Sequence, residues 1–125
     1  MSHPHPHETV ARQLIEGVTR GDVESVERLY ADDIRVWRNV DQRELVKKQA
    51  LKVVGILSQL KDIEYQDLRI VPTEDGYVQQ HVLACTSPKG AEVRMPACIV
   101  VRVKGDQIAR IDEYADSAAM APLMD

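Results

Sequence analysis

The stretch EVRMPACIVVRVKGDQIARIDEYAD, residues 92–116, decides the fold class of this chain. From Glu92 to Lys104 one alternating set of residues is wholly apolar, which is the period of a β-strand with one buried face. That set is Val93, Met95, Ala97, Ile99, Val101 and Val103. Gly105-Asp106 is a turn signal, and a second strand is expected from Gln107 to Asp116. The stretch therefore predicts a β-hairpin.

Two more strands are expected before this hairpin. Ile63–Ile70 and Tyr77–Thr86 both follow the period-two pattern. Asp75-Gly76 and Pro88-Lys89-Gly90 supply short turns after them. Strands joined by turns this short pair antiparallel, so the second half of the chain is predicted to be a four-stranded antiparallel meander.

The first half of the chain is mainly helical by the same test. Apolar residues fall at helical spacing from about Glu8 to Arg20, Gly21 then ends that helix, and Asp22 is placed to cap a second one. A short strand is expected at Ile34–Asn39, followed by the longest helix from about Asp41 to Leu60. Helices grouped before a run of strands indicate an α+β fold with three N-terminal helices.

The length of the chain limits the number of domains. At 125 residues a second core would not fit, so residues 1–125 are predicted to form a single domain with an ordered core from about 8 to 117. The ends, about 1–6 and 118–125, are expected to be mobile. A core this small makes association into a homodimer unsurprising.

Charge and hydropathy argue against several classes of partner. The net charge is -4 and neither sign forms a block, so we expect no nucleic-acid partner. No apolar run approaches the roughly 18 residues of a membrane span, and the N-terminus lacks the features of a secretory signal. A cytoplasmic protein with no membrane partner is the expectation.

We predict no metal and no cofactor. Cys85 and Cys98 lie in strand-like apolar stretches without CxxC spacing, so both are expected to be buried free thiols. The run from His3 to His7 could bind a metal weakly, but the proline between each pair of histidines favours a disordered end.

Glu113 is a carboxylate on a strand face that is otherwise apolar. On the last strand Ala109, Ile111, Glu113 and Ala115 are predicted to share the inward face. Burial would disfavour the charged form of Glu113 and raise its pKa. The alternative is a buried salt bridge with an arginine, for which the candidates are Arg38, Arg69 and Arg94.

The strand Tyr77–Thr86 leaves two arrangements open. If the face with Gln79 and His81 points inward, both residues share the interior with Glu113. If it points outward, His81 lies on the outer face of the sheet, in a dimer contact. Asn39 either donates a hydrogen bond to a substrate carbonyl or serves as a turn or capping residue.

The element order, with Tyr30-Ala31-Asp32-Asp33 before the first strand, resembles the SnoaL-like families of the nuclear-transport-factor-2-like superfamily. Ketosteroid-isomerase-like and limonene-epoxide-hydrolase-like proteins are the relatives. The resemblance implies a cystatin-like α+β fold. A cone-shaped, curved, mixed but mostly antiparallel sheet would wrap around a pocket that the three helices cover. A fold shared by so many activities does not by itself name one.

Comparison with the relatives removes one mechanism and weakens another. The isomerase's base aspartate would fall at Arg38, and its second acid on a strand face that is wholly apolar here. Trp37-Arg38-Asn39 looks like the Tyr-x-Asn pair of the epoxide hydrolases, and Glu113 would take the place of their water-activating aspartate. Their remaining arginine and aspartate would fall near Gln79 and His81.

The SnoaL-like cyclases, which pair an acid with a histidine, fit better. The resemblance therefore implies cofactor-free acid/base chemistry on a small apolar, oxygen-bearing substrate, of isomerase, cyclase or hydrolase type. Glu113 would be the base, His81 the partner acid and Asn39 the orienting group. The residues expected to line the pocket are Trp37, Gln79, Met95, Ile99, Val101 and Leu57.

Two further hypotheses need no chemistry. The chain could be a non-catalytic module that binds a hydrophobic ligand, or a domain that dimerises through its outer sheet face. Residues expected on that face are Arg94, Cys98, Val100, Arg102, Arg110 and Tyr114.

Overall fold

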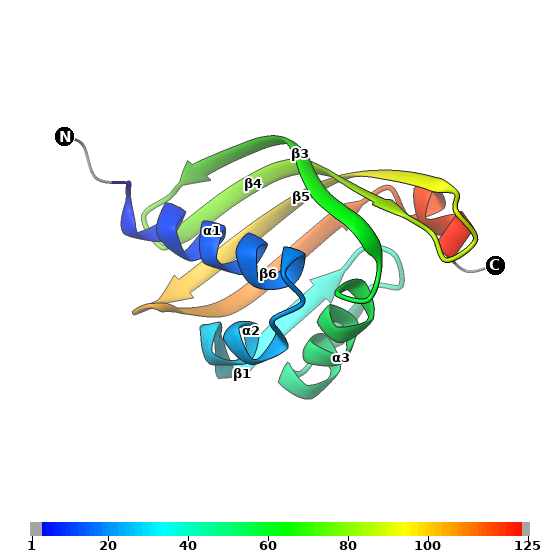
Figure 1. The fold of residues 1–125 in the computed structure, drawn as a ribbon. Coiled ribbons are helices and arrows are strands. Elements are labelled where there is room, and N and C mark those ends of the chain that lie inside the picture. The colour runs from blue at the N-terminus through cyan, green and yellow to red at the C-terminus, as the bar shows by residue number, and fades with distance from the viewer. Residues whose placement is uncertain (1–3, 124–125) are drawn as a thin grey trace.

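A computed structural model of the chain describes residues 4–123 and has the predicted α+β element order (Figure 1). The helices are α1 (Pro6–Thr19), α2 (Val23–Leu29), α3 (Lys47–Leu57) and the 3₁₀ helix η1 (Ser117–Leu123). The strands are β1 (Tyr30–Arg38), β2 (Arg43–Leu45), β3 (Lys61–Pro72), β4 (Gly76–Thr86), β5 (Glu92–Lys104) and β6 (Gln107–Ala115). Met1, Ser2 and His3, with part of the histidine-proline run, lie outside the described residues.

The six strands form one sheet in the order β2-β1-β6-β5-β4-β3. Neighbouring strands are antiparallel except for β1 and β6, which are parallel. Helices α1, α2 and α3 gather on one face of this sheet: α1 packs on β3 and β4, and α3 packs on β1 (Figure 1). The predicted α+β class and the mixed, mostly antiparallel sheet are confirmed.

The start of the third helix was predicted wrongly. Arg43–Leu45 is a short strand that pairs antiparallel with the end of β1, and α3 begins only at Lys47. Gln42, at φ 54°, turns the chain back, and the Asp41 carboxylate accepts a hydrogen bond from the Arg43 backbone. Pairing with β1 buries Leu45, so a tertiary contact overrides the local helical pattern.

A β-bulge changes the inward set on β6. Arg102 pairs with Arg110 while Val103 pairs with Ile108, so Ala109 is the extra residue. Ile108 therefore points inward and is fully buried, and Ile111 beyond the bulge is also buried. The predicted alternation holds only from Ile111 onward.

The core lies between the helices and the inner sheet face, meaning the face that α1, α2 and α3 cover. Its largest fully buried side chains include Tyr77 from β4, Ile34 from β1 and Ile108 from β6. No helix within residues 4–123 combines the length and apolar character that a membrane crossing requires.

Candidate functional site

Strand register brings the predicted polar residues together on the inner sheet face. Gln79, Ile99, Glu113 and Arg38 are neighbours across β4, β5, β6 and β1. The next row holds His81, Ala97 and Ala115. Because alanine carries only a methyl group, no large side chain of this second row stands between His81 and Glu113. The two predicted catalytic residues therefore share one face, separated by small residues.

Glu113 is a partly buried carboxylate without a counter-ion. No hydrogen bond or ion pair of its side chain occurs within residues 4–123. Its register neighbour Arg38 instead contacts Asp41, with Nη2 2.7 Å from Oδ2. Burial raises the pKa of Glu113, and the charge of Arg38 only partly opposes that rise. The salt bridge considered from the sequence is not among the contacts of the described chain.

His81 is buried on the same inner face, at 9% exposure. Its Nδ1 lies 3.0 Å from Nε2 of Gln79, and its ring centroid lies 4.7 Å from that of Tyr65. Burial lowers the pKa of His81 to about 4. The ring is therefore uncharged at neutral pH, and it can donate a hydrogen bond but holds no proton to give away as an imidazolium.

Three tyrosines complete a polar cluster that sequence reasoning missed. Tyr30 and Tyr77 are buried and Tyr65 is nearly so, and burial raises the pKa of all three phenols. The charge of Glu113 adds to the rise at Tyr30 and Tyr65. We call Tyr30, Tyr65, Tyr77, Gln79, His81 and Glu113 the inner polar cluster. A signal was present, because Tyr77 shares the alternating face of Gln79 and His81.

Two atoms of this cluster are fully buried without a hydrogen-bond partner. They are the Tyr77 hydroxyl oxygen and Oε1 of Gln79. Buried polar groups nearly always have a hydrogen-bond partner, so two such atoms without a partner on one strand are unusual. Both lie on β4, two residues apart, on the face they share with His81.

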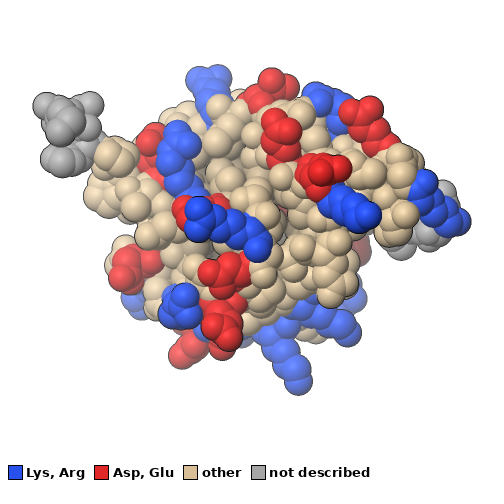
Figure 2. Space-filling model, in the orientation of Figure 1, with Lys and Arg blue, Asp and Glu red and all other residues tan. Residues whose placement is uncertain are grey.

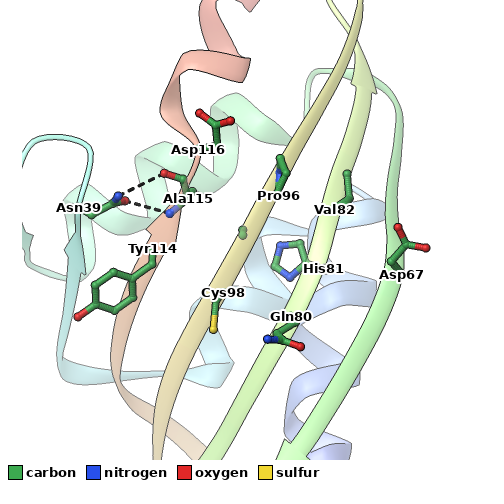
Figure 3. Close-up of a pocket in the computed structure, with 11 residues that line it drawn as sticks. Asn39, Asp67, Gln80, His81, Val82, Pro96, Cys98, Tyr114, Ala115 and Asp116 are labelled. Carbon is green, nitrogen blue, oxygen red and sulfur yellow. Dashed lines mark hydrogen bonds between the residues drawn. The ribbon is translucent and has the colours of Figure 1, made fainter.

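Asn39 is placed differently from the other predicted catalytic residues. Its amide bonds twice to the Ala115 backbone, with Oδ1 3.0 Å from the nitrogen and Nδ2 3.2 Å from the oxygen (Figure 3). Its own backbone N–H donates to the Glu113 carbonyl at 3.0 Å. Asn39 thus fastens the end of β1 to β6, and its side chain is not brought to the Glu113 carboxylate or the His81 ring.

The predicted pocket-lining residues divide between the two faces. Met95, Ile99, Val101 and Gln79 are buried on the inner face, and Leu57 is partly buried at the C-terminal end of α3. Trp37 corrects the prediction: it pairs with Asp112 on the outer face, and its ring lies 5.3 Å from that of Tyr114. Strand alternation explains this, because Val36 and Arg38 on either side of Trp37 point inward.

A hollow of about 560 Å³ opens on the outer sheet face, and its lining includes Asn39 and one member of the inner polar cluster, His81. Figure 3 shows Gln80 of β4, Cys98 of β5 and Tyr114 of β6 lining it. These three residues are register neighbours. Pro96 and Val82 form the next row, so apolar side chains lie next to polar ones in the lining of the hollow.

Neither cysteine is in a disulfide: Cys85 is buried and Cys98 is partly exposed. In residues 4–123 there is no group of three or more His, Cys, Asp or Glu side chains that could hold a metal ion.

A family model described as the SnoaL-like domain matches residues 11–111, most of the chain. The chain belongs to the SnoaL-like family. The family match runs from within α1 to Ile111 in β6. It includes every member of the inner polar cluster except Glu113, which lies two residues beyond it. No curated protein sequence matches this SnoaL-like chain.

Solved structures of the same fold cover almost the whole chain. IdmH from Streptomyces antibioticus, a proposed polyketide cyclase, is 19% identical with a TM-score of 0.81, covering 96% of this chain and 99% of its own. A proposed SnoaL-like polyketide cyclase from Shewanella putrefaciens CN-32 is 11% identical with a TM-score of 0.82, and 98% of each chain is covered. A proposed isomerase from Bacillus subtilis is 10% identical with a TM-score of 0.78, covering 97% of this chain and 96% of its own. At these identities the likeness concerns the fold.

Proposed function

We propose that this SnoaL-like protein catalyses cofactor-free acid/base chemistry on a small apolar molecule that carries a carbonyl group. The observation that carries the proposal is Glu113, a partly buried carboxylate with no ion pair among the described residues and a raised pKa. A base works best when its pKa approaches the working pH, and burial moves Glu113 in that direction. The proposed cyclases and isomerase of the same fold support the reaction class.

Glu113 would remove a proton from the carbon next to the carbonyl. The electron pair of the broken C–H bond moves into the new C=C bond, and the carbonyl oxygen becomes an enolate oxygen. The uncharged His81 and the tyrosine hydroxyls can donate hydrogen bonds to that oxygen. If the substrate carries a C=C bond next to that carbon, the product of this step is a dienolate, and return of the proton to its far carbon completes an isomerisation. In a cyclisation the enolate carbon attacks a second carbonyl, and the resulting alkoxide takes the proton from Glu113.

The other predicted residues enter this proposal in supporting roles. Met95, Ile99, Val101 and Leu57 would supply the apolar wall against which the substrate packs. Asn39 would position Glu113 through the backbone of β6, without touching the substrate.

A small uncharged substrate also suits the surface charge of the protein. Figure 2 shows lysine and arginine interspersed with aspartate and glutamate over the helical side of the molecule. That side offers no continuous basic patch for a nucleic acid.

The test uses hydrogen exchange, since the substrate is unidentified. A panel of apolar cyclic ketones is incubated in D2O with the protein, and loss of the proton next to the carbonyl is followed by NMR. We expect Glu113→Gln to slow the exchange at least about 100-fold. Glu92→Gln, at an exposed position on β5, is the matched control and should keep the rate. Equal rates in the two variants would contradict the proposal, and ligand binding without exchange would support a non-catalytic binding module.

We also propose that the outer sheet face pairs with a second copy of the chain. Two large apolar residues there stay exposed, Val100 at 44% and Tyr114 at 51%. An exposed sheet face with an apolar middle and surrounding charges of both signs can pair with a second copy of itself across a two-fold axis. Light scattering should report a dimer for the native chain and a monomer for Tyr114→Lys. A monomeric native chain would contradict this arrangement.

A further inference from the structure

We infer that Gln79 is a positioning residue that fixes His81 as an uncharged ring with its proton on Nε2. The inner polar cluster then presents a neutral hydrogen-bond donor, which selects an uncharged ketone or aldehyde oxygen over a carboxylate. The choice of ligand rests on the proposed function, whereas the state of the ring stands on the contacts of β4 alone.

The contact that fixes the ring is short and buried. Gln79 and His81 are two residues apart on β4 and share its inner face, with Gln79 Nε2 3.0 Å from His81 Nδ1. Gln79 is 1% exposed and His81 is 9% exposed. An amide NH2 group only donates hydrogen bonds, so Nδ1 must accept and the ring proton must sit on Nε2.

The opposite orientation of the Gln79 amide would place the proton on Nδ1, and its cost argues against it. In the present orientation the atom without a partner is Oε1, which is fully buried. Turning the amide over would put the NH2 group at that buried position with no acceptor. Buried N–H groups without partners are rarer than carbonyl oxygens with unfilled lone pairs.

No neighbouring charge favours a protonated ring. Tyr65 from β3 packs its ring on His81 and is itself uncharged. The β5 residues beside His81 are Ala97 and Met95, and from β6 the titratable residue on this face is Glu113, which makes no ion pair with His81 in the described chain. The lysines of α3 lie elsewhere: Lys48 and Lys52 are exposed, and Lys47 pairs with Asp32.

The free nitrogen of the ring can reach a ligand. His81 Nε2 has no partner in residues 4–123, and it is not among the fully buried atoms that lack one. A neutral Nε2–H stabilises an oxygen on which negative charge develops, without having to transfer a proton. It offers no fixed positive charge to a carboxylate, so uncharged carbonyl compounds are the ligand class that it suits.

The experiment is proton-detected ¹⁵N NMR of the full chain labelled at histidine, with His81→Asn used to assign the His81 signals. The inference predicts a neutral ring protonated on Nε2 from about pH 8 down to about pH 5. A ring protonated on Nδ1, or one that titrates at its ordinary pKa of 6.5, would overturn it.

Variants of Gln79 test the positioning role. Gln79→Glu replaces the donor with a carboxylate, so the proton should move to Nδ1 and the pKa of His81 should rise to 6.5 or above. Gln79→Met removes the bond and keeps the apolar volume, so both tautomers should appear. A ring unchanged in both variants would overturn the inference. These signals need no substrate, so ketone exchange can fail while the inference holds, and the reverse is equally detectable.

Discussion

Consecutive carboxylates on β6 face opposite sides of the sheet and meet opposite surroundings. Asp112 lies on the outer face, where its Oδ1 is 3.0 Å from Nη2 of Arg110. The same arginine also contacts Glu44, with Nη1 3.3 Å from Oε2. Glu113 lies on the inner face, where no described residue pairs with it and burial raises its pKa. One strand thus carries a carboxylate that is paired with an arginine and one that makes no ion pair within the described residues.

The difference shows that the charge state of a carboxylate among apolar neighbours depends on whether a cation pairs with it. Asp41 holds the guanidinium of Arg38, which is the cation nearest to Glu113 in strand register. Without that competing contact Arg38 could neutralise Glu113. The inner face therefore contains a carboxylate whose charge is disfavoured, and the outer face a network whose charges stabilise each other.

The largest expected effect is on stability, and it tests how much more tightly the inner face is packed than the outer face. Ile108 is fully buried on β6, whereas Val71 on β3 is 43% exposed. Ile108→Ala should lower the free energy of unfolding by about 2–5 kcal/mol, since it leaves a cavity, and Val71→Ala by about 1 kcal/mol or less. Urea denaturation measures both. Equal losses would mean that the two faces do not differ in packing.

A smaller effect should appear in the pH dependence of stability. Below 4.5, the ordinary pKa of a glutamate, folded and unfolded chains both hold the Glu113 proton. Between 4.5 and the raised folded-state pKa only the folded chain keeps it, so stability falls as the pH rises through that window. Glu113→Gln cannot lose a proton there.

The measurement is the difference in free energy of unfolding between Glu113→Gln and the native chain. It should grow in favour of the variant as the pH rises from 4.5 toward neutrality. A difference that is constant with pH would mean that folding does not shift the pKa of Glu113, and one that shrinks would mean that the anion is stabilised; either result contradicts the prediction.

The smallest effect concerns the outer face. Asp112→Asn removes the ion pair with Arg110, which is partly exposed on both sides. Such pairs contribute about 0–1 kcal/mol, and the loss should shrink further at high salt because the charges are screened. Thermal melts at low and high salt measure this. If the loss of stability in Asp112→Asn is the same at low and high salt, the ion pair of Asp112 is not what distinguishes it from Glu113.

Local pattern was enough to predict most of the sheet but not its interruptions. The alternation on β5 predicted the buried set from Val93 to Val103, and the face of β4 with His81 proved to be the buried one. The short strand Arg43–Leu45 and the bulge at Ala109 depend on pairing with distant strands. Such pairing leaves little trace in the local sequence.

The sequence could predict which face of the sheet a site residue lies on, but not which residues it contacts there. Alternation predicted that Glu113 faces inward but left the face of Gln79 and His81 open. Only register shows that Ala97 and Ala115 share a row with His81, next to the row of Glu113. Trp37 was predicted to line the pocket, but strand alternation turns it to the outer face, between the inward-pointing Val36 and Arg38. The ties of Asn39 to Ala115 follow from the parallel pairing of β1 and β6, which joins residues far apart in sequence.

The most direct test of the central claim is a ¹³C NMR titration of the Glu113 side-chain carboxyl in the full chain, with Glu113→Gln identifying the signal. The account predicts a midpoint above the ordinary glutamate pKa of 4.5, because burial of the carboxylate outweighs the opposing charge of Arg38. A midpoint at or below 4.5 would mean that the folded protein does not disfavour the anion. Glu113 would then be a structural charge, and the proposed base would be lost.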